Sequence, residues 1–142
     1  MQGFGDPPAY STYPVLAAAA LCVFGGVAHG LVGVFDLGVG WVPGFLMLGL
    51  GAALFLFGLV LLIRFVEARD AMTDLAPRTR LYEARHERVA YLAGLAVTLL
   101  SLLADAGWTA LHKGAWHLAP AALTLAAAWL FGRLWARRAA QA

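Results

Sequence analysis

The sequence predicts an all-α integral membrane protein, a four-helix antiparallel transmembrane bundle built from two hairpins. Hydrophobic residues make up 62% of the chain and charged residues 13%, whereas charged residues are about a quarter of a typical soluble domain. The mean hydropathy is +0.76. Four long apolar runs share the chain, and a single charged segment divides them into two pairs. We therefore treat all 142 residues as one transmembrane domain.

Each apolar run is close to the length that a spanning helix needs, which is roughly 20 residues for roughly 30 Å of hydrocarbon. The predicted spans cover residues 13–35, 42–64, 89–111 and 117–136. Pro14 suits the first turn of the first helix, because that position needs no intrahelical N–H donor. The glycine-rich turn after Asp36 and the turn at 112–117 are short, so each pair of helices must return antiparallel. We expect the first helix to be retained, because the residues before it lack the basic stretch of a secretory signal.

The connector between the second and third spans, residues 65–88, is the most charged part of the chain. We expect it to continue the second helix into water, to break at Pro77, and to enter a helix capped by Thr79. Its acids and arginines interleave, which is typical of a solvated elbow whose exposed ion pairs contribute little stability. The alternative is a docking surface for another protein. That surface would consist of Arg69, Arg78, Arg80, Arg85 and Arg88.

The basic residues also predict the orientation, because they are retained on the cytoplasmic side of a membrane. All nine arginines lie in or beside the connector or near the C-terminus, whereas the two opposite turns hold only Lys113. We therefore expect both termini and the connector to be cytoplasmic. The alanine- and arginine-rich composition is typical of a GC-rich bacterial source, so we expect the protein to lie in the inner membrane. Aromatic belts are expected at Trp41, Trp108 and Trp116 outside, and at Tyr82, Tyr91 and Trp135 inside.

Small and polar residues recur at helical spacing within the apolar runs and should mark the faces where helices meet. The first run carries Cys22, Gly26, His29, Gly33 and Asp36, and the third carries Thr98, Ser101, Asp105, Thr109 and His112. The second repeats Gly44, Gly51 and Gly58. Small faces let backbones approach closely, and we expect the Ser and Thr hydroxyls to bond across the contacts.

His29 and Asp105 are the polar residues that packing alone explains least well. An acidic side chain near mid-membrane costs roughly 2.5 to 3.5 kcal/mol on insertion scales, so it normally faces the interior and has a partner. Both residues lie six positions before the outer end of their spans, roughly 9 Å below the boundary. We predict that they form an intramembrane pair. Asp36, His112 and His117 should lie above this pair, at an outer mouth.

Three roles for this pair stay open: a structural hydrogen bond between the first and third helices, a proton or cation relay, and a metal or haem site. His112 and His117 are five residues apart, a poor ligand spacing on a helix, so the sequence predicts no metal site and no cofactor, with haem as the less favoured alternative. No nucleophile elbow, phosphate loop, HExxH or CxxC motif is present, so we expect no enzymatic activity.

These observations favour a non-catalytic accessory or assembly subunit of a larger respiratory or transport complex. Its expected partners are the lipid bilayer and other membrane subunits, with no nucleic acid. The alternative is a small homo-oligomeric ion or solute transporter or channel that uses the His29 and Asp105 pair. The third possibility is a redox subunit associated with haem or quinone.

Overall fold

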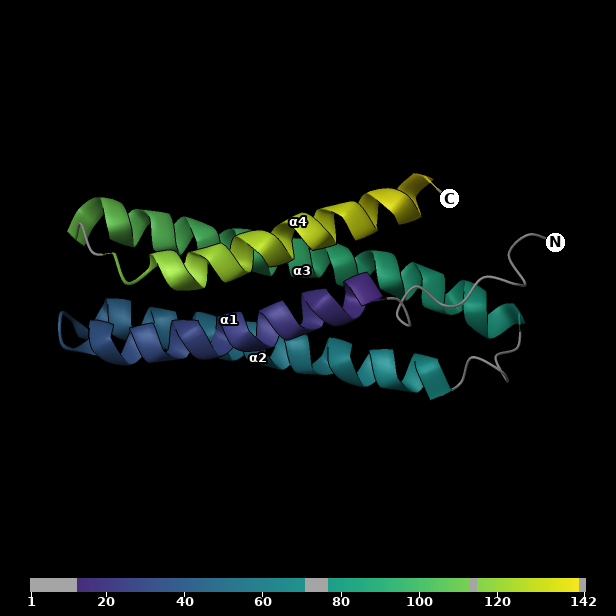
Figure 1. Ribbon diagram of the computed structural model, residues 1–142, viewed down its shortest axis with the longest axis horizontal. Helices are drawn as coiled ribbons and strands as arrows, with labels where there is room; N and C mark the ends of the chain where they lie inside the picture. The colour runs from purple at the N-terminus through teal and green to yellow at the C-terminus, as the bar shows by residue number, and fades with distance from the viewer. Residues whose placement is uncertain (1–12, 71–76, 113–114, 141–142) are drawn as a thin grey trace.

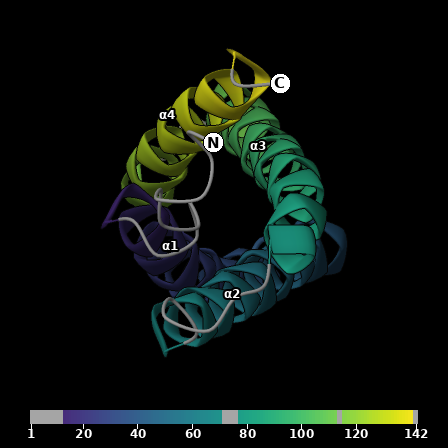
Figure 2. The same cartoon turned by 90° about the vertical axis from the view of Figure 1, so that its right-hand side faces the viewer.

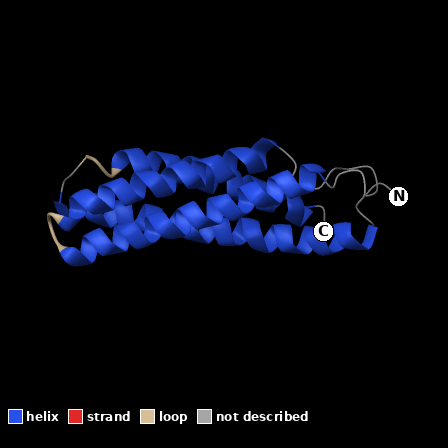
Figure 3. Ribbon diagram, turned by 90° about the horizontal axis from the view of Figure 1, so that it is seen from below, coloured by secondary structure: helices blue, strands red, loops and turns tan. Residues whose placement is uncertain are grey.

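The computed structural model describes residues 13–70, 77–112 and 115–140, and these are helical apart from short turns (Figure 3). The helices are α1 (Tyr13–Leu37), α2 (Trp41–Asp70), α3 (Pro77–His112) and α4 (Leu118–Ala140). Consecutive helices run in opposite directions, and the turns after α1 and α3 lie at one end of the bundle (Figure 1). We call this the turn end. The start of α1 and the end of α4 lie at the opposite, terminal end.

Four helices are long and apolar enough to cross a membrane, as the sequence predicts. The apolar spans are Tyr13–Leu37, Trp41–Glu67, Glu87–Leu111 and Leu118–Arg138. The helices α2 and α3 continue beyond their spans into the charged connector. Pro77 begins α3, which places Thr79 inside its first turn. The expectation that Thr79 caps this helix is therefore wrong, because Pro77 already supplies a first-turn residue that needs no N–H donor.

Glycines bring α1 and α2 into backbone contact. A Cβ atom added at Gly51 would lie 2.7 Å from the carbonyl oxygen of Gly26, and one added at Gly26 would lie 2.6 Å from the carbonyl oxygen of Gly51. A Cβ atom at Gly58 would lie 2.8 Å from the carbonyl oxygen of Ala19. The seven-residue repeat of glycine in α2 is thus a close-packing face, of the kind that small residues make between helices in lipid.

Viewed along the bundle, the helices follow one another around a ring (Figure 2). α1 packs against α2 and α4, and α4 packs against α3, whereas α2 and α3 meet over a much smaller area. Across the diagonals, no described Cα atom of α1 lies within 8 Å of one in α3, nor one of α2 within 8 Å of one in α4. Any contact between α1 and α3 must therefore be made by side chains that reach through the interior.

The apolar core occupies the half of the bundle toward the terminal end. It includes Val15, Ala18, Ala19, Cys22, Leu54, Leu61, Tyr91, Ala127, Phe131 and Leu134. Two expected belt residues belong to the interior instead: Tyr91 is 0% exposed and Trp108 is 5% exposed. Both lie on the inward face of α3, where a buried ring fills the bundle better than a small residue would. Trp41, at the start of α2, is exposed as expected.

Candidate functional site

The interior near the turn end holds four ionisable side chains. His29 and Asp36 lie seven residues apart, two helical turns, and so on the same face of α1. Asp105 comes from α3, and His117 immediately precedes α4. None of the four is more than 2% exposed. We refer to Asp36, His117, Asp105 and His29 as the polar network.

Hydrogen bonds join these four side chains in one continuous line. His29 Nε2 lies 2.8 Å from Asp105 Oδ2, and the other oxygen, Oδ1, lies 2.8 Å from His117 Nδ1. His117 Nε2 in turn lies 2.8 Å from Asp36 Oδ2. The line ends at the Gly25 carbonyl oxygen, which lies 2.8 Å from His29 Nδ1. The bond from His29 to Asp105 crosses the α1 to α3 diagonal, where the backbones do not approach.

Two tryptophans hold the turn-end part of the polar network in place. Trp116 donates its indole N–H to Asp36 Oδ1 over 3.1 Å, and this tryptophan is 46% exposed. Trp108 stacks on the imidazole of His117, with 5.1 Å between ring centroids and 27° between the planes. The network therefore reaches from the bundle interior to a side chain at its surface.

The hydrogen bonds fix how many protons the polar network holds. A carbonyl oxygen only accepts, so His29 Nδ1 must carry a proton that it donates to Gly25. Each of the three links between a ring nitrogen and a carboxylate oxygen also needs one proton, on one atom or the other. These four links require four protons in all.

Four protons make the polar network electrically neutral. Two neutral imidazoles and two carboxylates hold two protons and carry a charge of −2, so two further protons bring the charge to zero. Losing one proton would leave two acceptors facing each other and a net charge in an apolar interior, which is costly. The arrangement is therefore saturated, yet each proton lies between two groups that can both bind it.

The structure places most of the residues singled out from the sequence. His29 and Asp105 meet, and Asp36 and His117 are parts of the same buried network rather than an open mouth above it. The side chain of His112 lies outside the described residues. His117 is the link that sequence spacing missed, because its reach into the bundle depends on the path of the turn before α4.

The Ser and Thr hydroxyl groups were expected to form hydrogen bonds between helices, but they form them within their own helices. Thr98 donates to Gly94 within α3, Ser101 donates to Val97, and Thr109 donates to Asp105, in each case to a backbone carbonyl oxygen. In α4, Thr124 does the same. A carbonyl one turn back lies within reach of a short hydroxyl side chain, so the local bond forms in preference to a distant one.

The connector arginines are largely beyond what the structure describes. The side chains of Arg69, Arg78, Arg80 and Arg85 lie outside the described residues, and Arg88 is partly buried at the start of the α3 span. The structure shows one ion pair that the sequence did not single out: Arg138 Nε lies 2.8 Å from Glu87 Oε2, and Glu87 is 1% exposed. Only the fold of α4 against α3 brings these distant residues together.

The histidines of the polar network use their ring nitrogens within it. Among the described residues, no group of three or more His, Cys, Asp or Glu side chains is arranged to hold a metal ion. Both ring nitrogens of His29 and of His117 already face oxygen atoms. Neither histidine could bind iron without breaking the polar network.

Comparison with known proteins adds no relative to this picture. No family model, no curated protein and no solved structure matches the chain.

Proposed function

We propose that this chain is a small transport-type membrane protein that transfers protons, and that the polar network is its transfer site. The observation that supports the proposal is the continuous hydrogen-bonded line from the half-exposed Trp116 to the buried His29. Ionisable side chains inside a membrane are rare and typically belong to ion pathways and proton relays. Four of them joined in one line exceed what helix packing requires.

The two ring nitrogens of each histidine make directed proton transfer possible. When His117 accepts a proton from Asp36 on Nε2, it can release the proton on Nδ1 to Asp105, so one proton enters and one leaves. Asp105 passes a proton in the same way to His29 Nε2. Each step exchanges a proton between atoms that already lie 2.8 Å apart. A proton that enters at Asp36 gives the network a charge of +1, and the network is neutral again when another proton has left it.

The proposal includes an orientation. The composition favours a bacterial inner membrane, and the arginine distribution supports an orientation with both termini in the cytoplasm. The turn end with Asp36 and Trp116 would then face outward. Trp116 covers the outer end of the network and holds the Asp36 carboxylate in position through its indole N–H. Protons would then enter from the outer side. The chain would work within the bilayer as a homo-oligomer.

The test is proton flux into liposomes that contain the purified protein and an entrapped pH-sensitive dye. A potassium gradient with valinomycin supplies the driving potential. We expect Asp105→Asn to lower the flux by about ten-fold or more, since ten-fold corresponds to about 1.36 kcal/mol in a barrier. Equal flux for the wild type and Asp105→Asn would contradict the proposal.

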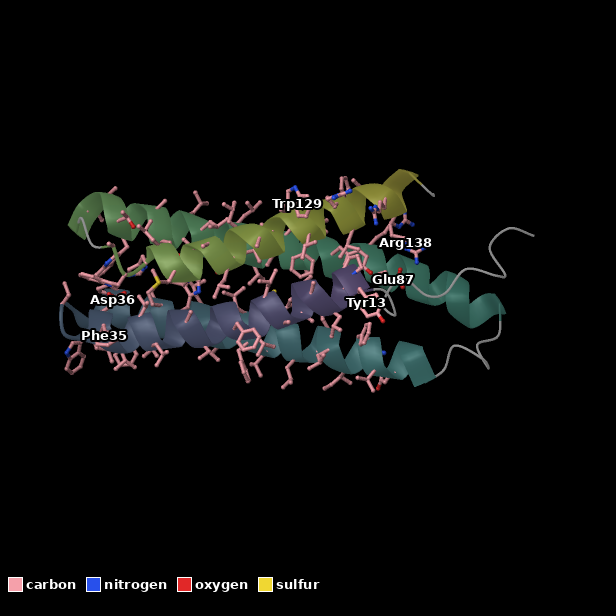
Figure 4. All side chains as sticks on the ribbon, in the orientation of Figure 1. Tyr13, Phe35, Asp36, Glu87, Trp129 and Arg138 are labelled. Carbon is pink, nitrogen blue, oxygen red and sulfur yellow. The ribbon has the colours of Figure 1, made fainter. Side chains whose placement is uncertain are left out.

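Asp105→Asn is a suitable variant because it can keep the hydrogen bonds. The amide nitrogen can donate to His29 Nε2, and the amide oxygen can accept from His117 Nδ1. The variant removes only the capacity of residue 105 to gain or lose a proton. Phe35→Ala is the matched control, because Phe35 neighbours Asp36 but points outward and is 73% exposed (Figure 4). Its flux should equal that of the wild type.

A specific feature of α2 favours a second candidate, an accessory or assembly subunit of a larger membrane complex. α2 packs closely on α1 alone, and its remaining surface carries large exposed apolar side chains. These include Phe45, Leu46, Leu56, Val60 and Ile63. Purification in mild detergent from native membranes tests this candidate. Larger chains in fixed stoichiometry would support it, whereas a homo-oligomer alone would contradict it.

A further inference from the structure

The inward face of α3 is polar far beyond Asp105. In the part of α3 whose burial the structure describes, residues 87–111, seven residues are buried and none has an aliphatic side chain. They recur every three or four positions, as expected for one face of a helix. They are Glu87, Tyr91, Gly94, Thr98, Ser101, Asp105 and Trp108. We call these residues the polar face of α3.

The polar face almost spans the membrane. Asp105 follows Glu87 by 18 positions, which is about 27 Å along a helix at about 1.5 Å per residue, against roughly 30 Å of hydrocarbon. Figure 4 shows Asp36 at the turn end and Glu87 with Arg138 at the terminal end. Glu87 forms its ion pair with Arg138 there. Each end of the bundle therefore has a buried carboxylate beside polar partners.

One apolar step interrupts the polar face. Between Tyr91 and Thr98 the inward position is Gly94, and a Cβ atom added there would lie 2.8 Å from Cε1, Cε2 and Cζ of Phe131. The Phe131 ring edge formed by Cε1, Cζ and Cε2 thus packs directly against the backbone of Gly94. Phe131 is 0% exposed, and Phe57 packs edge-on against it, with 5.8 Å between the ring centroids.

We propose that protons cross the bundle along the polar face of α3 from Asp105 to Glu87, and that Phe131 on Gly94 is the hydrophobic barrier that limits their rate. This inference rests on the proposed proton transfer through the polar network and extends it to the other side of the membrane. Apolar constrictions control conduction by excluding water. The Phe131 ring separates Thr98 from Tyr91, which are about 10 Å apart along the helix axis.

The proton balance of the crossing is simple. A proton enters from the solution at Asp36 and moves through His117 and Asp105 to His29 Nε2. His29 then breaks its bond to Gly25 and gives its Nδ1 proton to water that enters transiently beside Phe131. The hydroxyl oxygens of Ser101 and Thr98 accept hydrogen bonds from this water while their own O–H groups keep donating to backbone carbonyl oxygens. The water gives a proton to the Glu87 carboxylate, and Glu87 releases that proton to the solution at the terminal end. Glu87 is then again a carboxylate paired with Arg138. No electrons move, and the imposed gradient is the driving force.

The experiment measures flux in the same liposomes for Phe131→Ala, which removes the ring and opens space for water between Tyr91 and Thr98. We expect the flux to rise about ten-fold above the wild type, equivalent to about 1.36 kcal/mol. Trp129→Ala is the matched control, because Trp129 lies on α4 and points outward, with 58% of it exposed (Figure 4). Its flux should stay at the wild-type level.

The double variant Phe131→Ala with Asp105→Asn separates a true path from a general leak. Flux that falls back to the Asp105→Asn level would support the path. Flux as high as in Phe131→Ala alone would overturn it, because protons would then bypass Asp105. Phe131→Val keeps an apolar side chain and replaces the alanine variant if that variant does not fold. It should raise the flux in the same direction, and unchanged flux would also overturn the inference.

The same measurements distinguish the two proposals. If Asp105→Asn conducts as well as the wild type, the proposed function itself fails. If Asp105→Asn lowers the flux but neither Phe131 variant raises it, transfer through the polar network stands and the barrier assignment alone is wrong.

Discussion

Replacing Asp105 by alanine should destabilise the bundle far more than replacing it by asparagine. Asp105 joins His29 of α1 to His117 before α4 through two 2.8 Å hydrogen bonds. Alanine removes both bonds and leaves two buried ring nitrogens without these partners. Hydrogen bonds between membrane helices contribute about 0.6 to 2 kcal/mol each, so the expected loss of unfolding free energy is about 1 to 4 kcal/mol.

Asparagine should cost under about 1 kcal/mol, because its amide can restore both bonds in the orientation set by His29. Since His29 Nδ1 donates to Gly25, its Nε2 is free to accept from the asparagine N–H. The assay is equilibrium unfolding in mixed micelles of mild detergent and increasing sodium dodecyl sulfate, followed by circular dichroism. Equal stability of the alanine and asparagine variants would refute the reasoning. It would mean that the buried hydrogen bonds do not hold α1 to α3.

Other predictions test packing and charge. Gly51→Val should lower the thermal unfolding midpoint strongly, because its Cβ would lie 2.7 Å from a backbone oxygen of α1, whereas Gly49→Ala meets nothing within 4 Å and should be neutral. Trp116→Phe removes the indole N–H that donates to the buried Asp36 carboxylate and should lower the unfolding free energy by up to about 3 kcal/mol. An unchanged unfolding free energy would show that this hydrogen bond does not stabilise the fold. Arg138→Ala should destabilise by about 1 to 3 kcal/mol, because it removes the 2.8 Å ion pair with the buried Glu87 carboxylate. Adding Glu87→Gln should recover part of that loss in a double-mutant cycle, and strict additivity would contradict the pairing.

Much of the fold follows from composition and periodicity, because a bilayer permits few solutions for a chain this apolar. The four spans are predicted within a few residues, and the glycines at 44, 51 and 58 identify the face that packs on α1. The residues at which α2 ends and α3 begins in the connector were harder to predict from the sequence. Pro77 is compatible with two opposite predictions, because proline breaks the interior of a helix but is well suited to the first turn of one.

One part of the candidate site could be predicted from the sequence and another part could not. Helical spacing places His29 and Asp105 at matching depth on inward faces, and the structure joins them by a hydrogen bond. It does not place His117, because that side chain reaches inward from a turn with no regular period. The ion pair of Glu87 with Arg138 also depends on how α4 lies on α3, which no local pattern records. Interior contacts of this kind require the tertiary arrangement.

The measurement that tests the central claim most directly is the collapse of a pH gradient across liposomes that contain the wild type or Asp105→Asn, with no other solute present. Proton transfer through the polar network predicts that the wild type dissipates the gradient about ten-fold faster or more, for gradients imposed in either direction. Identical rates for the two proteins, at equal amounts and equal folded fractions, would contradict the account.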